Sequence, residues 1–234
     1  EGVNIQCKSG VRFQYKSIIG RTKHIHGRHK LVADTDPRSG ASEAYRILAT
    51  NLNFKNIDGE FKCIAVTSSM PGEGKSTTAA NLAITLAQGG KKVVLVDPDL
   101  RRPSLHKIFG LSSLVGLTTA LVEAIDPINI CQQFNDLQLK VITSGPLPPN
   151  SSELLASNRM KLILERLKEV FDFVIIDTPP TLGLNDTLAL STSVDGFLLV
   201  IASGLAPKKA IKQTKEQLDR VGAKLIGTIL NGID

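Results

Sequence analysis

Residues 69–77, with the sequence Ser-Met-Pro-Gly-Glu-Gly-Lys-Ser-Thr, decide the fold of this chain. They have the form of a phosphate-binding loop, except that Ser69 stands where glycine or alanine is usual. An apolar run at 63–67 precedes the loop and predicts a buried strand, and a helical pattern follows as far as Gly89 and Gly90. Strand, glycine-rich loop and helix in that order are the context in which this motif binds phosphate.

The loop offers backbone N–H groups, one cation and one hydroxyl to a bound phosphate. Gly72 and Gly74 let the backbone turn its N–H groups inward, and the new helix adds its unpaired N–H groups and positive dipole end. We expect Lys75 to reach the β- and γ-phosphates and the Ser76 hydroxyl to ligate Mg²⁺. The residues expected to hold the nucleotide are Ser69, Met70, Pro71, Gly72, Glu73, Gly74, Lys75, Ser76 and Thr77.

Length and composition agree with one domain. A chain of 234 residues can form one α/β domain with a sizeable core, and no apolar run approaches the roughly 18–20 residues of a membrane span. The lack of an initiator Met and of a signal peptide is expected of a cytoplasmic piece of a longer protein. The three cysteines show no metal-type spacing and are expected to be reduced.

The net charge of +6 is concentrated at the beginning of the chain. Residues 1–30 hold seven basic side chains and one acid, which leaves 21 basic and 21 acidic side chains in residues 31–234. We therefore predict a basic tail over 1–35 and a neutral domain over 36–234. A solvated leader is the simplest interpretation of the tail; a juxtamembrane segment beside anionic lipid or a contact with nucleic acid are the alternatives.

Beyond the loop, strand and helix patterns alternate, which predicts a doubly wound, mostly parallel sheet with helices on both faces. No internal repeat and no second domain is evident, and residues 104–136 give only weak helical patterns. The expected strands are 63–67, 93–96, 137–143, 173–176, 197–201 and 225–230, and the expected helices are about 40–53, 75–88, 151–170 and 206–221.

Acidic side chains follow two of the expected strands. Asp97 and Asp99 come after the apolar run at 93–96, and Asp177 closes the strand at 173–176. Each alone could be a helix cap or a turn residue. Because ligands bind at the carboxyl ends of strands in open α/β sheets, we expect all three to converge on a metal ion near Lys75 and Ser76.

Together these motifs resemble the bacterial tyrosine kinases of capsule and exopolysaccharide export. Members of that family carry Walker A, Walker A′ (Asp-x-Asp-x-Arg) and Walker B motifs, which are matched at 69–77, 97–101 and 173–177. The segment 143–155 is also typical of the family, and the likeness extends from about Glu43 to Asn231. The resemblance implies a P-loop NTPase fold of the ParA/MinD-like branch.

The resemblance also implies a reaction, in which Mg²⁺ is held by Ser76, Asp99 and Asp177 directly or through water. MgATP is expected to donate its γ-phosphoryl group to tyrosines of this chain and of other proteins, with Asp97 as the base for the hydroxyl. Arg101 is expected to neutralise developing charge or to form a salt bridge on its loop. Asn231 resembles an adenine-reading Asn, although a simple strand-end turn with Gly232 is as good an interpretation.

The implied partners come from the same resemblance. They are a membrane polysaccharide co-polymerase that activates the kinase, separate or fused, and further copies of this chain assembled through the helix that carries Glu43 and Arg46. We accordingly expect a cytoplasmic location at the inner face of the cell membrane. The family's Glu-x-x-Arg-x-x-Arg motif is incomplete, because Ala49 stands at its third position. An ordinary exposed ion pair is the alternative.

Two observations limit the inference and separate it from its rivals. The sequence has only Tyr15 and Tyr45 and does not include the family's C-terminal tyrosine cluster, so either that tail was removed or is disordered, or the substrate lies on another protein. A partition or septum-positioning ATPase uses a second Lys where this chain has Met70, and the neutral body argues against a DNA surface, so no nucleic-acid partner is expected. A nucleotide-dependent adaptor without turnover is the third alternative, and a small-molecule kinase is disfavoured because 104–136 shows no acceptor pocket.

Overall fold

The computed structural model describes residues 14–16, 31–56 and 61–232. In this part of the chain an eight-stranded sheet has the strand order β1-β8-β7-β2-β6-β3-β5-β4, and each pair of neighbours is parallel except β4 with β5. The strands are β1 (Gln14–Lys16), β2 (Cys63–Ser68), β3 (Val93–Val96), β4 (Gln132–Gln133), β5 (Leu139–Ile142), β6 (Phe173–Asp177), β7 (Gly196–Ala202) and β8 (Leu225–Asn231).

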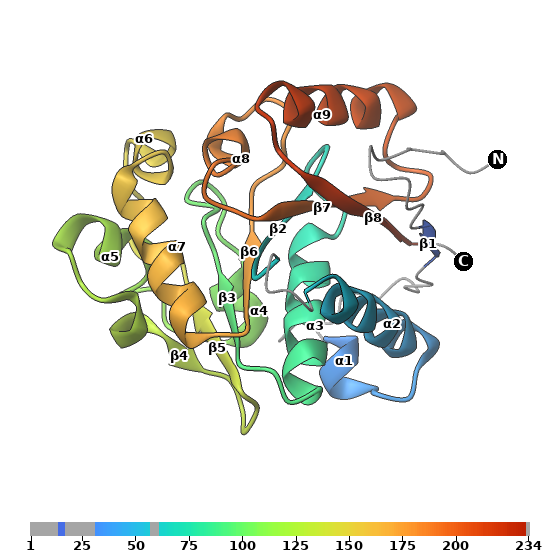
Figure 1. Ribbon diagram of the computed structural model, residues 1–234, viewed down its shortest axis with the longest axis horizontal. Helices are drawn as coiled ribbons and strands as arrows, with labels where there is room; N and C mark the ends of the chain where they lie inside the picture. Colours follow the sequence, from blue (N-terminus) through green and yellow to red (C-terminus); the bar gives the residue numbers. More distant parts are fainter. Residues whose placement is uncertain (1–13, 17–30, 57–60, 233–234) are drawn as a thin grey trace.

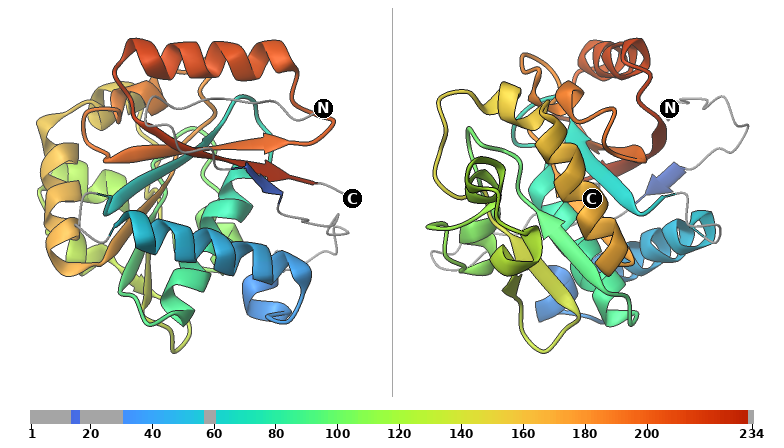
Figure 2. Two further views of the ribbon diagram at one scale, coloured as in Figure 1. Left: turned by 45° about the vertical axis from the view of Figure 1, so that its right-hand side comes forward. Right: turned by 60° about the vertical axis from the view of Figure 1, so that its left-hand side comes forward.

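Helices cover both faces of this sheet, as the sequence predicts for a doubly wound fold (Figure 1). In Figure 2, α1 and α2 lie on one side of the strands and α9 on the other. The helices are α1 (Val32–Thr35), α2 (Gly40–Lys55), α3 (Lys75–Gln88), α4 (Leu105–Phe109), α5 (Leu117–Glu123), α6 (Ser151–Leu155), α7 (Asn158–Val170), α8 (Asp186–Ala189) and α9 (Lys208–Arg220), with a 3-10 turn η1 at Pro127–Ile130.

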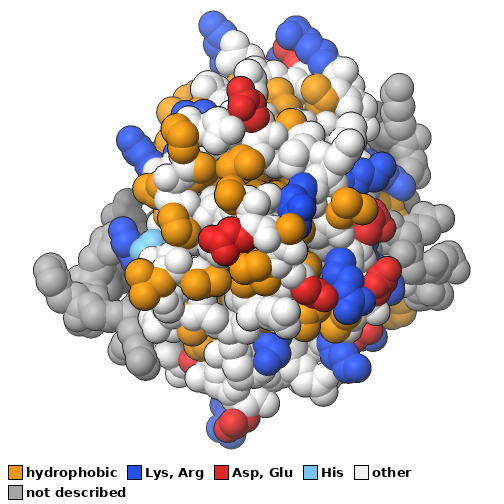
Figure 3. All heavy atoms as spheres, turned by 90° about the vertical axis from the view of Figure 1, so that its left-hand side faces the viewer, with side chains coloured by type: hydrophobic (Ala, Val, Ile, Leu, Met, Phe, Trp, Pro, Cys, Tyr) orange, Lys and Arg blue, Asp and Glu red, His pale blue; other side chains and the backbone are white. Residues whose placement is uncertain are grey.

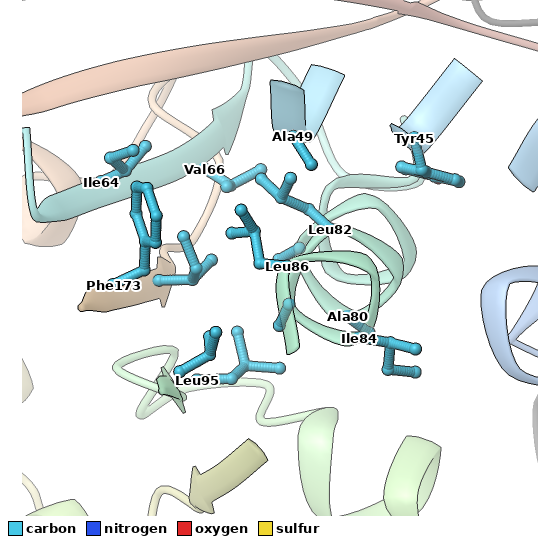
Figure 4. Packing of buried hydrophobic residues seen from close by; sticks show 14 of the residues in the cluster. Tyr45, Ala49, Ile64, Val66, Ala80, Leu82, Ile84, Leu86, Leu95 and Phe173 are labelled. Carbon is cyan, nitrogen blue, oxygen red and sulfur yellow. The ribbon is translucent and has the colours of Figure 1, made fainter. Parts of the chain in front are cut away.

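The apolar strands explain the two cores, because alternate side chains of a strand point to opposite faces. Ile64 and Val66 of β2 belong to one buried cluster with α1–α4, whereas Cys63 and Ala65 belong to a second cluster with α5–α9. Figure 4 shows the first cluster, in which Leu82 of α3 lies close to Val66. Burial of α3 against the sheet fixes the position of the loop from which it starts.

Two local differences from the sequence expectations have a clear cause. The expected helix over 151–170 is two helices, because Ser157 ends the first and caps the second by accepting a hydrogen bond from the Met160 N–H at 3.3 Å. The short helix α1 was not expected. It packs on α3, and the buried Ala33 N–H donates to Asn81 Oδ1 at 2.9 Å.

The predicted division into a tail (1–35) and a domain (36–234) stays a prediction, because most of residues 1–30 lie outside the described residues. Leu31 and Ala33, which the prediction assigns to the tail, are buried in the core of the domain. Apart from Lys16, which belongs to β1, the basic residues at 1–30 lie outside the described residues. In the described residues, no helix has the length and apolar character needed to cross a membrane.

Hydrophobic side chains are also exposed on the face that carries α5 and α7 (Figure 3). Leu114 before α5, Val122 of α5 and Leu162 of α7 are 83%, 68% and 69% exposed. Charged side chains lie among the apolar ones on this face (Figure 3).

Candidate active site

The phosphate-binding loop connects β2 to α3 and has the backbone form that the sequence predicts. Gly72 and Gly74 have φ of +84° and +87°, in the left-handed region that favours glycine. Gly74 is also packed tightly, since a Cβ at this position would overlap the Asn231 side-chain amide. Any other residue at Gly74 would be strained at this φ and would force the Asn231 amide to move from the loop.

Glu73 holds the loop from within, a role that the sequence did not indicate. Its side chain is buried, and its carboxylate accepts hydrogen bonds from the N–H of Met70 at 2.6 Å and of Ala202 at 3.1 Å. The Asn231 amide donates to the Glu73 carbonyl at 3.0 Å, while Asn231 Oδ1 is buried with no partner. The loop is therefore fastened to β7 and to the end of β8.

Lys75 forms the electrostatic centre of the site. Its ammonium lies 3.2 Å from Asp177 Oδ1, 3.5 Å from Asp99 Oδ2 and 3.1 Å from Ser76 Oγ. Burial lowers the pKa of Lys75, but attraction to Asp177, Asp99 and Asp97 is stronger in sum, so its pKa is raised. The structure thus brings together Lys75, Ser76, Asp99 and Asp177, as the sequence predicts.

Asp97 differs from the other acids because it faces the backbone. It is fully buried, and its Oδ2 accepts from the N–H of Ser104 at 3.0 Å and of Leu105 at 2.9 Å. Its Oδ1 accepts from the Asp99 N–H at 3.2 Å. Burial and the charge of Asp177 raise the pKa of Asp97 to about 7. Asp97 therefore joins β3 to the start of α4 and has no exposed surface in this structure.

Arg101 forms a salt bridge, but with Asp186 of α8 and not on its own loop as one of its two expected roles required. Its Nε donates to Asp186 Oδ2 at 2.7 Å, and its NH2 group lies 3.4 Å from Asp186 Oδ1. The Asp186 side chain is fully buried at the start of α8 and also accepts from the Ser152 hydroxyl of α6, whereas the Arg101 side chain is 48% exposed. Asp186 is a residue of the site that sequence reasoning missed.

A cleft of about 810 Å³ opens beside the loop. Eight of the expected site residues line it: Pro71, Gly72, Gly74, Lys75, Ser76, Thr77, Asp99 and Arg101. The lining omits Ser69, Met70, Glu73, Asp97, Asp177 and Asn231. It also includes residues that the sequence did not indicate: Arg102, Ser104, Lys107, Ile108, Pro180, Leu182, Gly183 and Leu184.

The second wall of the cleft is the segment between β6 and α8. Its start is tied to the P-loop strand, because the N–H groups of Thr181 and Leu182 donate to the carbonyls of Ser68 and Ser69 at 2.8 and 3.2 Å. The sequence alone did not indicate that residues 180–184 line the cleft, because their position depends on these hydrogen bonds to the end of β2.

The donor set fits a nucleotide with Mg²⁺. A hydroxyl and carboxylates are the hard oxygen ligands that Mg²⁺ takes, and Lys75 shows that Asp99 and Asp177 already face a cation. In the described residues, no cluster of three or more His, Cys, Asp or Glu side chains is arranged to hold a metal by itself. Mg²⁺ commonly keeps several waters and bridges phosphates, so it does not need such a cluster.

Comparisons with known proteins agree with this geometry. Residues 61–226 match a family model described as an AAA domain. The tyrosine-protein kinase YwqD of Bacillus subtilis (strain 168) is 45% identical over 205 residues, which cover 88% of this chain and 86% of YwqD. The chain belongs to the bacterial tyrosine kinases. It is accordingly a protein-tyrosine kinase.

Solved structures place the kinase in the same family and fold. The kinase domain of the Escherichia coli tyrosine kinase ETK superposes with a TM-score of 0.83 at 35% identity, covering 90% of this chain and 83% of that one. The septum site-determining protein MinD of Pyrococcus horikoshii OT3, complexed with Mg-ADP, shares the fold at a TM-score of 0.62 and 22% identity, over 73% of this chain and 70% of that chain. The expected ParA/MinD-like P-loop fold is confirmed.

Proposed function

We propose that this kinase transfers the γ-phosphoryl group of MgATP to protein tyrosines and thereby regulates the synthesis and export of a capsular polysaccharide or exopolysaccharide. The observation that carries the site assignment is the meeting of Lys75 with Asp99 and Asp177 at the start of α3. These groups come from the start of α3, the segment after β3 and the end of β6, and they meet at the carboxyl ends of the strands.

The proposed role of each residue follows from its contacts. Lys75 and the N–H groups of the loop hold the β- and γ-phosphates, and Ser76, Asp99 and Asp177 hold the metal directly or through water. Mg²⁺, when bound, neutralises charge on the phosphates. Asn231, which lies against Gly74 with a free Oδ1, is proposed to face the adenine.

In the proposed reaction, the tyrosine oxygen bonds to the γ-phosphorus while the bond from that phosphorus to the bridging oxygen breaks. ADP leaves with the electron pair, and the phenol proton passes to a carboxylate. Asp97 remains the proposed base, since a pKa of about 7 is closer to that of a phenol than an ordinary carboxylate's. This role requires the segment 97–104 to move, because Asp97 is fully buried.

The acceptor is proposed to be a tyrosine other than Tyr45. Tyr45 is only 1% exposed in α2, so the folded domain does not present it. Tyr15, a tyrosine on another copy, or a tyrosine of another protein is the proposed target.

The proposed partners are a membrane co-polymerase that activates the kinase and further copies of the chain, which would place the kinase at the inner face of the membrane. In α2, Arg46 Nε donates to Glu43 Oε2 at 2.8 Å, and both side chains are exposed. Ala49 is buried, so the third position of the assembly motif faces the core. Replacing Glu43 and Arg46 with Ala and measuring the mass in solution tests assembly through α2, and an unchanged mass contradicts it.

Incubation with Mg-[γ-³²P]ATP and a tyrosine-containing substrate tests the function. Phosphotyrosine is expected for the wild type and for Lys161→Met, which removes an exposed lysine on α7, but not for Lys75→Met. ATP hydrolysis without phosphotyrosine would instead indicate an ATPase switch, and nucleotide binding without turnover an adaptor.

A further inference from the structure

The cleft continues beyond the P-loop, on the side where no nucleotide group has been assigned. Asn231 contacts the loop at Gly74 but does not line the cleft, whereas Ser104, Lys107, Ile108 and Leu182 to Leu184 line it in addition to the loop. With the adenine proposed at Asn231 and the phosphates at Lys75, we take this part of the lining as the approach to the γ-phosphate. An acceptor must enter here to attack in line.

Four basic side chains line the cleft, and two of them have partners. Lys75 pairs with Asp99 and Asp177, and Arg101 pairs with Asp186. Arg102 and Lys107 are exposed, and within the described parts of the chain neither forms an ion pair.

The charges of the cleft are therefore unbalanced at its mouth. Asp99 is the only carboxylate among the lining residues, and it already faces Lys75. Two cations near the entry of a partly enclosed cleft attract anionic groups, because low-dielectric walls concentrate the field. In the proposed site, Lys75 and the loop N–H groups bind the phosphates. Arg102 and Lys107 are therefore available to pair with the acceptor.

The same part of the cleft is lined by apolar side chains. Ile108 is 7% exposed, and Leu182 and Leu184 are half-buried on the opposite wall. A tyrosine ring gains free energy by burying its faces on such side chains while its hydroxyl stays polar.

We propose that Arg102 and Lys107 select the acceptor, so that this kinase prefers tyrosines with acidic residues beside them. The acceptor ring packs between Ile108 and Leu182, and flanking carboxylates of the peptide pair with the two cations. This inference rests on the proposed tyrosine-kinase function and names the class of substrate for it.

Peptides that differ only in charge test the selection. Three synthetic peptides carry one tyrosine flanked by Glu, by Gln or by Lys, and kcat/KM is measured for each at saturating MgATP. The wild type is expected to favour the Glu peptide over the Gln peptide by about 2- to 5-fold for each cation engaged, the range of exposed ion pairs. The preference should weaken in 0.5 M NaCl, because salt screens exposed charges.

Variants then assign the preference to the two side chains. Arg102→Gln with Lys107→Gln is expected to bring the Glu-to-Gln ratio close to 1 and to leave the KM for ATP unchanged, whereas Lys161→Gln keeps the wild-type ratio. Circular dichroism confirms that each variant is folded.

Two outcomes would overturn the inference while leaving the kinase function intact. One is equal use of the three peptides by the wild type. The other is a double variant that keeps the peptide preference but raises the KM for ATP, which would assign both cations to the nucleotide. Absence of phosphotyrosine on every peptide and on the chain itself would instead refute the proposed function, and the inference with it.

Discussion

Replacing Arg101 with Ala removes the cation that faces Asp186, whose side chain is fully buried. A buried carboxylate is left without its partner, a change that costs about 3 kcal/mol at the lower end of the known range. The lower end applies because Arg101 is half-exposed and water can enter where it stood. In a domain of this size each kcal/mol lowers Tm by about 2–4 °C, so we expect a loss of about 6–12 °C.

Removing the acid is expected to cost much less. Asp186→Asn keeps an oxygen for the Ser152 hydroxyl and leaves Arg101 free to be hydrated, so we expect a loss of about 1 kcal/mol. The double variant contains no unpaired buried charge and should resemble Asp186→Asn alone. The coupling between the two positions is then about 3 kcal/mol in magnitude, at the upper end of the range for residues in contact.

Urea unfolding of the two single variants and the double variant measures these differences. Arg166→Ala is the control, because its ion pairs with Asp126 and Glu169 are exposed and should change stability little. A loss from Asp186→Asn as large as that from Arg101→Ala would refute the asymmetry. Additive losses in the double variant would refute the pairing itself.

Three further predictions concern the loop and the acid behind it. Glu73→Gln should cost about 2 kcal/mol, since one of two charge-assisted bonds to backbone N–H groups is lost, and an unchanged Tm would contradict its role as a brace. Because burial raises the pKa of Asp97 to about 7 from an unfolded value near 4, the folded chain holds an extra proton and loses stability as pH rises through this window. Without nucleotide, the Tm of Asp97→Asn should fall less steeply from pH 5 to 8 than the Tm of the wild type. Parallel curves for the two proteins would contradict the raised pKa of Asp97. Gly74→Ala should abolish binding of a fluorescent ATP analogue, whereas Gly90→Ala, with φ of +81° but open space around it, should keep it; equal binding by both would contradict the tight packing of the loop.

The elements predicted best from the sequence are those specified by residues close together. The run Val93–Val96 forms β3 with the predicted ends, and the helix after the P-loop ends just before Gly89 and Gly90. Continuous apolar runs and glycine punctuation are local signals. The meeting of Asp99 and Asp177 with Lys75 followed from the rule that strand ends meet at one edge of a parallel sheet.

The features that could not be predicted depend on contacts between distant residues. The Arg101–Asp186 pair joins residues 85 positions apart. The sequence around Arg101 gives no sign that Asp186 is its partner, and the sequence around Asp186 gives no sign of Arg101. The cleft wall at 180–184 is similar, since its place is set by backbone bonds to the end of β2. The break at Ser157 was hidden by apolar spacing that continues on both sides of the cap.

The position of Lys75 has a consequence for the order of events in catalysis. Before anything binds, one ammonium lies near two carboxylates and offsets one of their two charges, so a phosphate chain that draws Lys75 toward itself leaves Asp99 and Asp177 repelling each other. A divalent cation removes that repulsion by taking the place of the ammonium between the acids. Nucleotide and metal should therefore bind with strong positive cooperativity, and this chain should take up ATP poorly in a cell compartment depleted of free magnesium.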